Sequence, residues 1–138
     1  MILAEASSFI RQCRDRMHAL YNKPVFDEWI VVTLQPGAPV LSFYEGPRVE
    51  QFRQRFLDDV APLRQELEGR HLSVGDFAFV LDATGTAYDA CVRLGGASYL
   101  LCNHTTRSMA EIRQDPLWLA AQKVFVELTE KFRADPLA

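Results

Sequence analysis

The spacing of hydrophobic residues along the chain predicts helix, two strands, helix, three strands, helix. Apolar residues recur every three or four positions, as in helices, over 2–21, 47–68 and 108–133. Between these stretches lie short runs rich in β-branched and aromatic residues, separated by turn residues. The expected strands are 27–34, 39–45, 75–82, 86–95 and 97–104. Residues 1–138 are therefore expected to form a single mixed α/β (α+β) domain.

The first helical stretch carries one narrow apolar stripe on an otherwise charged segment. Its members are Leu3, Ala6, Ile10, Cys13, Met17 and Leu20. Asn22 and Pro24 end the helix, because a proline disfavours helical geometry in the residue before it. Such an amphipathic helix needs an apolar surface to lie on.

The second helical stretch has a wider apolar pattern, and this pattern suggests a contact with another molecule. Its stripe consists of Val49, Phe52, Phe56, Val60, Leu63 and Leu67. Pro47 can open the helix, Pro62 is expected to kink it, and Gly69 is expected to close it. Phe56 and Leu57 lie at the edge of the stripe, where self-association would cover them. The alternative is a monomer whose helices all pack inward.

The links between the last three strands are short, which predicts an antiparallel meander. Turn residues occur at Gly85 and at Gly95-Gly96, and Pro36-Gly37 similarly joins the first two strands into a hairpin. The segment Tyr99-Leu100-Leu101-Cys102 is apolar at consecutive positions, so both of its faces should be buried. We therefore expect the strand 97–104 near the middle of the sheet.

The last helical stretch begins with a capping box and contains a break. Ser108 and Glu111 have the spacing at which each side chain satisfies a free backbone N–H. Asp115-Pro116 is expected to interrupt the helix, with Asp115 capping a second start. Its apolar stripe then continues through Ala121, Phe125, Leu128 and Phe132.

Composition and charge narrow the classes of function. The net charge of −3 gives no electrostatic drive toward nucleic acid or an anionic membrane surface. The apolar runs are too short to cross a bilayer, and the first residues lack the pattern of a signal peptide. Three cysteines without paired spacing are most simply free thiols. We therefore expect a cytoplasmic protein that binds neither nucleic acid nor membrane.

The residues that could support catalysis or metal binding are few and scattered. Cys91, Cys102 and His104 could meet on neighbouring strands, but a structural zinc site needs four ligands. Cys102 beside His104 lies within an apparent core strand, which favours an inert thiol over a nucleophile. Asp82 and Asp89 flank a turn, where aspartate is common for local reasons. We predict no catalytic, metal or cofactor-binding residues, hence a protein that is not an enzyme.

The polar link between the fifth strand and the last helix has two interpretations. It includes Asn103, His104, Thr105 and Arg107. It is either a simple strand-to-helix connection with good capping residues, or a loop that faces a binding partner.

The order of the elements resembles that of the roadblock/dynein light chain superfamily over nearly the whole chain. The most similar part runs from Cys91 to Arg113: a strand, Gly95-Gly96, an apolar strand, a polar link and a helix. It is similar to the end of bacterial gliding-motility (Mgl-type) roadblock proteins, and a divergent paralogue fits equally. The resemblance implies a roadblock-like (profilin-like) αββαβββα fold, with a five-stranded antiparallel sheet and helices on both faces.

The resemblance also implies a function in protein binding. Roadblock proteins form homodimers through the second helix and the adjoining sheet edge, which here assigns the dimer interface to Phe52, Phe56, Leu57, Val60 and Leu63. Partners would be a small Ras-like GTPase, another roadblock protein or a polarity scaffold. The setting would be bacterial cell polarity or motility, with recruitment to a cell pole and no cofactor.

Two other function classes stay open. One is a GAF- or PAS-like domain that senses a small molecule, although the dense packing expected around Phe77 and Phe79 argues against an internal cavity. The other is a small enzyme that uses the isolated cysteine, histidine and aspartate residues.

Overall fold

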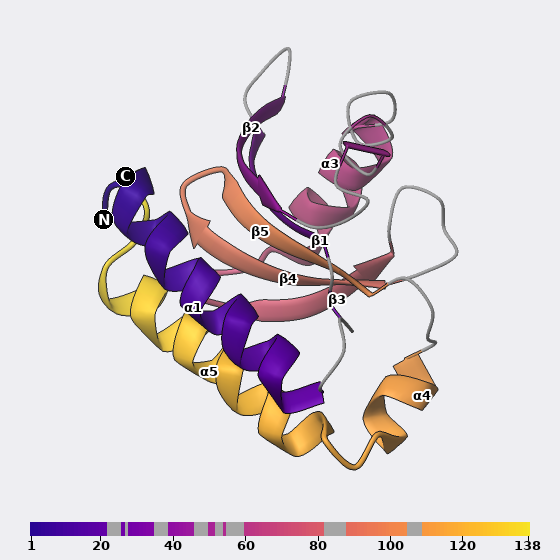
Figure 1. Ribbon diagram of the computed structural model, residues 1–138. Helices are drawn as coiled ribbons and strands as arrows, with labels where there is room; N and C mark the ends of the chain where they lie inside the picture. The colour runs from indigo at the N-terminus through magenta and orange to yellow at the C-terminus, as the bar shows by residue number, and fades with distance from the viewer. Residues whose placement is uncertain are drawn as a thin grey trace.

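Five strands form one antiparallel sheet in the order β2-β1-β5-β4-β3 (Figure 1). The computed structural model describes residues 1–21, 26, 28–34, 39–45, 50–51, 54, 60–81, 88–104 and 109–138. The strands are β1 (Glu28–Leu34), β2 (Pro39–Glu45), β3 (Phe77–Leu81), β4 (Tyr88–Gly95) and β5 (Ser98–His104). The helices are α1 (Leu3–Tyr21), α3 (Val60–Arg70), α4 (Met109–Gln114) and α5 (Trp118–Ala134). The mixed α/β class and the antiparallel pairing are thus confirmed.

Helices cover both faces of the sheet. α1 and α5 lie side by side on one face, and α3 lies on the other (Figure 1). Because successive side chains of a strand point to opposite faces, Trp29 and Val31 enter the core beneath α1 and α5, whereas Ile30 enters the core beneath α3. The two termini meet at one end, where the Ala138 N–H donates to the Met1 carbonyl oxygen at 2.9 Å.

α1 packs through most of the stripe that its sequence predicts. Ala6, Ile10, Cys13 and Met17 are fully buried, whereas Leu3 is 38 % exposed and Tyr21 in place of Leu20 completes the buried stripe. An aromatic pair and an ion pair are among the contacts that join α1 to α5. The rings of Phe9 and Phe132 meet edge to face, with centroids 6.2 Å apart, and Arg16 forms an ion pair with Glu127.

β5 is the central strand, as its apolar sequence predicts. It pairs with β1 on one side and with β4 on the other. Leu100 and Cys102 face α1 and α5, whereas Leu101 faces α3, and all three side chains are buried. The predicted hairpin of β1 and β2 and the predicted meander of β3, β4 and β5 are both present.

α3 ends differently from the prediction. The helix runs through Gly69 to Arg70, and the residue with left-handed geometry is His71, whose φ is 51°. The His71 N–H donates to the carbonyl oxygen of Glu68 at 3.3 Å, and the helix ends at Arg70, two residues beyond the predicted end at Glu68. Pro62 lies in the first turn of α3, where its missing N–H has no intrahelical role.

The predicted break in the last helical stretch is present between α4 and α5. The Leu117 N–H donates to Oδ1 of Asp115 at 2.9 Å, and the Trp118 N–H donates to the Asp115 carbonyl oxygen at 2.9 Å. These bonds form a turn that precedes α5, whose N-cap is Leu117 and not Asp115 as predicted, and the break lets α4 leave the direction of α5 (Figure 1).

Gly75 holds the turn before β3 against α5. Its φ is +87°, and a Cβ atom there would lie 2.7 Å from the Thr129 carbonyl oxygen and 2.8 Å from Cβ of Arg133. Only glycine combines this backbone geometry with such a close approach. The position of β3 relative to α5 thus depends on this residue.

We predict that Gly75→Ala lowers the free energy of unfolding by more than about 2 kcal/mol, because the methyl group adds a clash to an unfavourable φ. The matched control is Gly69→Ala within α3, where a Cβ would meet nothing within 4 Å. Alanine there should stabilise by about 0.5–1 kcal/mol. Urea unfolding of both variants checks the pair, and equal effects would contradict it.

Candidate functional site

The predicted dimer residues fall largely outside the described part of the chain. Phe52, Phe56 and Leu57 lie outside the described residues, and Val60 is described only as the first residue of α3. Leu63 is described fully. Only 4 % of its surface is exposed, because it packs with Leu67 against the sheet of its own chain. Its assignment to an interface stays a prediction, and its packing here is internal.

The predicted partner-facing loop begins at the end of β5. Asn103 and His104 are its last two residues, whereas Thr105 and Arg107 lie outside the described residues. In the sheet register Asn103 lies opposite Glu28 of β1 on one side and Asp89 of β4 on the other. The loop therefore starts beside two acidic residues that sequence spacing did not connect.

Asp89 lies within β4, inside the predicted strand 86–95, but its side chain is buried, which its position beside a turn did not indicate. Only 2 % of its surface is exposed, and Glu28 is 1 % exposed. Residues directly opposite each other on neighbouring strands point to the same face of the sheet. Val80 lies opposite Asp89 and belongs to the core beneath α3, so both carboxylates lie on the face that α3 covers. Asp82 lies outside the described residues. No cluster of three or more His, Cys, Asp and Glu side chains within the described ranges could hold a metal ion.

The cysteines are separated by the sheet. Cys91 belongs to the core beneath α3, whereas Cys13 and Cys102 belong to the core beneath α1 and α5. Cys91 and Cys102 therefore cannot ligate one metal ion. Burial raises the pKa of the Cys13 thiol to about 11, and it raises the pKa values of Cys91 and Cys102 well above the usual range. These thiols stay protonated at neutral pH and are poor nucleophiles.

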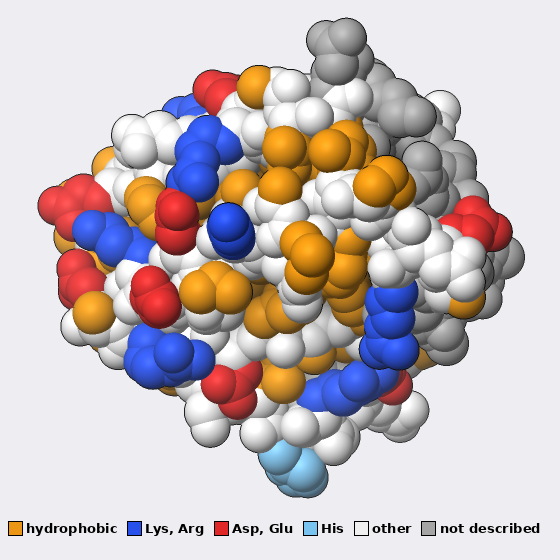
Figure 2. Space-filling model, turned by 90° about the horizontal axis from the view of Figure 1, so that it is seen from below, with side chains coloured by type: hydrophobic (Ala, Val, Ile, Leu, Met, Phe, Trp, Pro, Cys, Tyr) orange, Lys and Arg blue, Asp and Glu red, His pale blue; other side chains and the backbone are white. Residues whose placement is uncertain are grey.

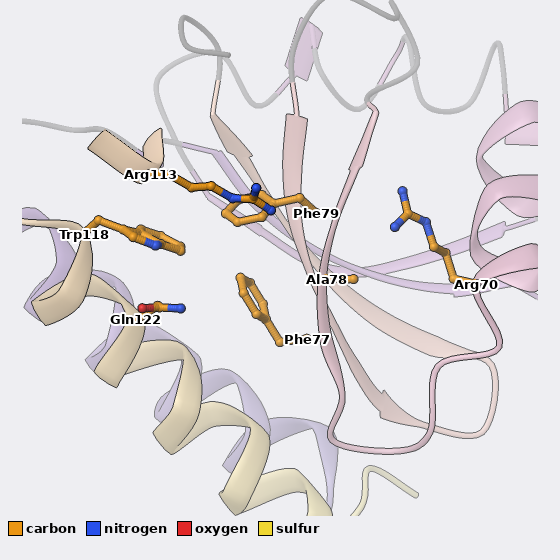
Figure 3. A pocket seen from close by; sticks show the side chains of 7 residues that line it. All are labelled: Arg70, Phe77, Ala78, Phe79, Arg113, Trp118 and Gln122. Carbon is orange, nitrogen blue, oxygen red and sulfur yellow. The ribbon is translucent and has the colours of Figure 1, made fainter. Parts of the chain in front are cut away.

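A hollow of about 460 Å³ lies at the free edge of β3. Its lining comes from three helices and this strand, and consists of Arg70, Phe77, Ala78, Phe79, Arg113, Trp118 and Gln122 (Figure 3). Phe77 and Phe79 are partly exposed, contrary to the dense packing expected from sequence, and they belong to β3, an edge strand of the sheet that the described residues form. Arg70 lies across β3 from Trp118 and Gln122 (Figure 3).

A second hollow, of about 280 Å³, continues the first along α5. The two share Phe77 and Gln122 in their linings. The other residues of the second hollow are Leu72, Gly75, Asp76, Phe125, Val126, Thr129 and Arg133. We call the two together the α5–β3 groove. Sequence patterns did not indicate it, since nothing in them shows that β3 lies at an edge next to α5.

Comparison with protein-family models, with curated proteins and with solved structures finds no match to this chain. Across the described residues, no helix has both the length and the apolar character needed to cross a membrane.

We predict that the native thiols react with a disulfide reagent at pH 8 at least about 100-fold more slowly than those of the unfolded chain, because burial keeps them protonated and inaccessible. The measurement is the rate of DTNB reaction with and without 6 M guanidinium chloride, about the denaturant level that unfolds most domains. Cys13→Ser identifies any contribution of the thiol on α1. A native thiol that reacts as fast as in the unfolded chain would contradict the assignment of inert core cysteines.

Proposed function

We propose that the protein is a non-catalytic, homodimeric adaptor of the roadblock type that regulates a small Ras-like GTPase system. Two features support the proposal. The first is the order of helix, two strands, helix, three strands and helix, with α3 on one face of the sheet and α1 and α5 on the other. The second is the absence of a plausible nucleophile or metal cluster from the described part of the chain.

The observation that carries the proposal is the free edge of β3. The Arg93 N–H donates to the Asp76 carbonyl oxygen at 3.1 Å, so Arg93 directs its backbone groups toward β3. Backbone N–H and C=O groups of successive residues point to opposite sides of a strand. The backbone groups of Cys91 therefore also point toward β3, where Ala78 is its partner in register. The N–H and C=O groups of Phe77 and Phe79 consequently point away from the sheet, and a second strand could pair with them.

A second copy of this chain is the occupant that we propose for this edge. Two β3 strands related by a twofold axis run antiparallel and would extend the sheet across the dimer. The outward side of α3 presents Gln65 and Glu68, which are exposed and polar. Ala61 and Pro62 are exposed as well, so the described part of the second helical stretch offers a small apolar surface. The main apolar contribution would come from Phe52, Phe56 and Leu57, as the resemblance implies.

A dimer built in this way would act as a binding platform in the cytoplasm, with a GTPase, another roadblock protein or a polarity scaffold as partner. Bacterial cell polarity or motility, with recruitment to a cell pole, is the setting that the resemblance suggests. The alternative of a small-molecule sensor calls for an enclosed interior pocket. The hollows described here lie at the sheet edge, so no observation favours that alternative.

Light scattering on the purified chain tests the dimer. We expect twice the mass of one chain, and we expect Ala78→Lys to raise the dissociation constant at least about 10-fold, because two added charges would meet at the paired edges. Ser73→Lys, an exposed position before β3, is the matched control. Circular dichroism shows whether each variant is folded. A wild-type chain that stays monomeric up to about 100 μM, well above common dissociation constants, would overturn the proposal.

The regulatory part is tested separately with purified Ras-like GTPases from the source organism, loaded with GTP or GDP. We expect co-elution with one nucleotide state and a changed rate of GTP hydrolysis or nucleotide release. Binding to neither state would remove the GTPase from the proposal without affecting the dimer.

A further inference from the structure

The α5–β3 groove has the length of a short peptide. It extends along α5 from Trp118 to Arg133. At 1.5 Å per helical residue this is about 22 Å, the length of roughly seven residues of extended chain. The groove opens at the surface instead of enclosing a cavity, which suits a segment of a larger molecule better than a small ligand. Figure 2 looks onto this side of the molecule, where apolar side chains reach the surface between basic ones.

The floor of the groove is a connected set of aromatic rings. Phe77 meets Phe79 edge to face, with centroids 5.2 Å apart, and stacks on Phe125 at 4.9 Å. The ring of Phe79 lies 5.5 Å from that of Trp118. Val126 of α5, which lines the second hollow, is 50 % exposed. Aromatic pockets with an apolar rim are the usual anchoring points of protein interfaces.

The charged side chains that line the groove favour an occupant that carries a carboxylate. The first hollow contains two arginines, Arg70 and Arg113, and no acidic side chain among its lining residues. Arg70 is paired with Glu66 at 2.8 Å. Arg113 is exposed and forms no hydrogen bond or ion pair with any described residue. A free guanidinium beside an aromatic floor is complementary to a carboxylate carried next to an apolar side chain.

At the other end of the groove, the charges are already paired. Arg133 lies 3.6 Å from Asp76 and also donates to the Gly75 carbonyl oxygen at 3.2 Å. The position of the recognised carboxylate is therefore set by Arg113, at the Trp118 end.

We propose that the α5–β3 groove binds an extended segment of a partner protein in which a large apolar residue is adjacent to an acidic one. The apolar side chain packs on Phe79 and Trp118, and the carboxylate pairs with Arg113. The kind of partner rests on the proposed adaptor function, but the groove does not depend on the homodimer. A second copy would use the backbone edge of β3, whereas the rings of Phe77 and Phe79 face α5.

The test uses the two tryptophans as internal reporters. Trp118 lines the groove, whereas Trp29 is fully buried and donates its indole N–H to the Phe26 carbonyl oxygen at 2.6 Å. The probe is the end-blocked peptide GEFEVEG, added to full-length protein with ¹⁵N-labelled tryptophan. We expect a saturable shift of the Trp118 indole signal, with a dissociation constant below about 1 mM, and no shift for Trp29. Trp118→Phe assigns the two signals.

Two peptides and two variants define the specificity. GKFKVKG tests charge, and GESESEG tests the apolar anchor; both should bind at least about 10-fold more weakly. Arg113→Glu should weaken the binding of GEFEVEG by a similar factor, and this variant should bind GKFKVKG more tightly than GEFEVEG. Lys123→Glu, an exposed charge reversal on α5 that lies outside both linings, should change nothing.

Three results would overturn the groove proposal. They are no saturable Trp118 shift up to about 5 mM peptide, equal binding of GKFKVKG, or equal binding of free phenylacetate, which would indicate a small-molecule site. Light scattering on the same samples separates this proposal from the dimer. A monomer that binds GEFEVEG refutes only the homodimer, and a dimer that does not bind it refutes only the groove.

Discussion

The fold depends on burying both faces of one central strand. β5 carries apolar side chains at consecutive positions, so a single covering layer would leave half of them in water. α1 and α5 cover one face and α3 covers the other, which makes three layers around a strand that itself has neighbours on both sides. β3, which is separated from β5 by β4, is less completely covered, and partly exposed aromatic side chains are found there.

β3 is the strand where this incomplete cover matters most. It pairs with β4 on one side only, and its aromatic side chains are partly exposed between α5 and the edge. Gly75 sets how closely the start of β3 approaches α5, and the break at Asp115 moves α4 so that Arg113 reaches the same hollow. The backbone edge and the groove are thus adjacent but chemically different. The edge offers backbone hydrogen-bonding groups, whereas the groove offers an aromatic surface beside the guanidinium group of Arg113.

The polar row across the sheet is a second consequence of strand order. Glu28, Asn103 and Asp89 come from three separate parts of the chain and become neighbours only because β5 lies between β1 and β4. Both carboxylates are buried, and each lies opposite Asn103 in the sheet register. The core thiols, in contrast, are divided between the two faces of the sheet and pack within the two cores.

The sequence alone determined the elements, the stripe of α1, the central place of β5 and the break at Asp115, because periodicity and local capping act over a few residues. It misplaced the end of α3 at Gly69, since His71 adopts the left-handed geometry instead, and it did not indicate that Asp89 is buried. Only the tertiary structure decided that β1 pairs with β5, that β3 lies at an edge, and that Arg113 meets Phe79 and Trp118. These are contacts between distant segments, which depend on how whole layers pack and leave no trace in local spacing.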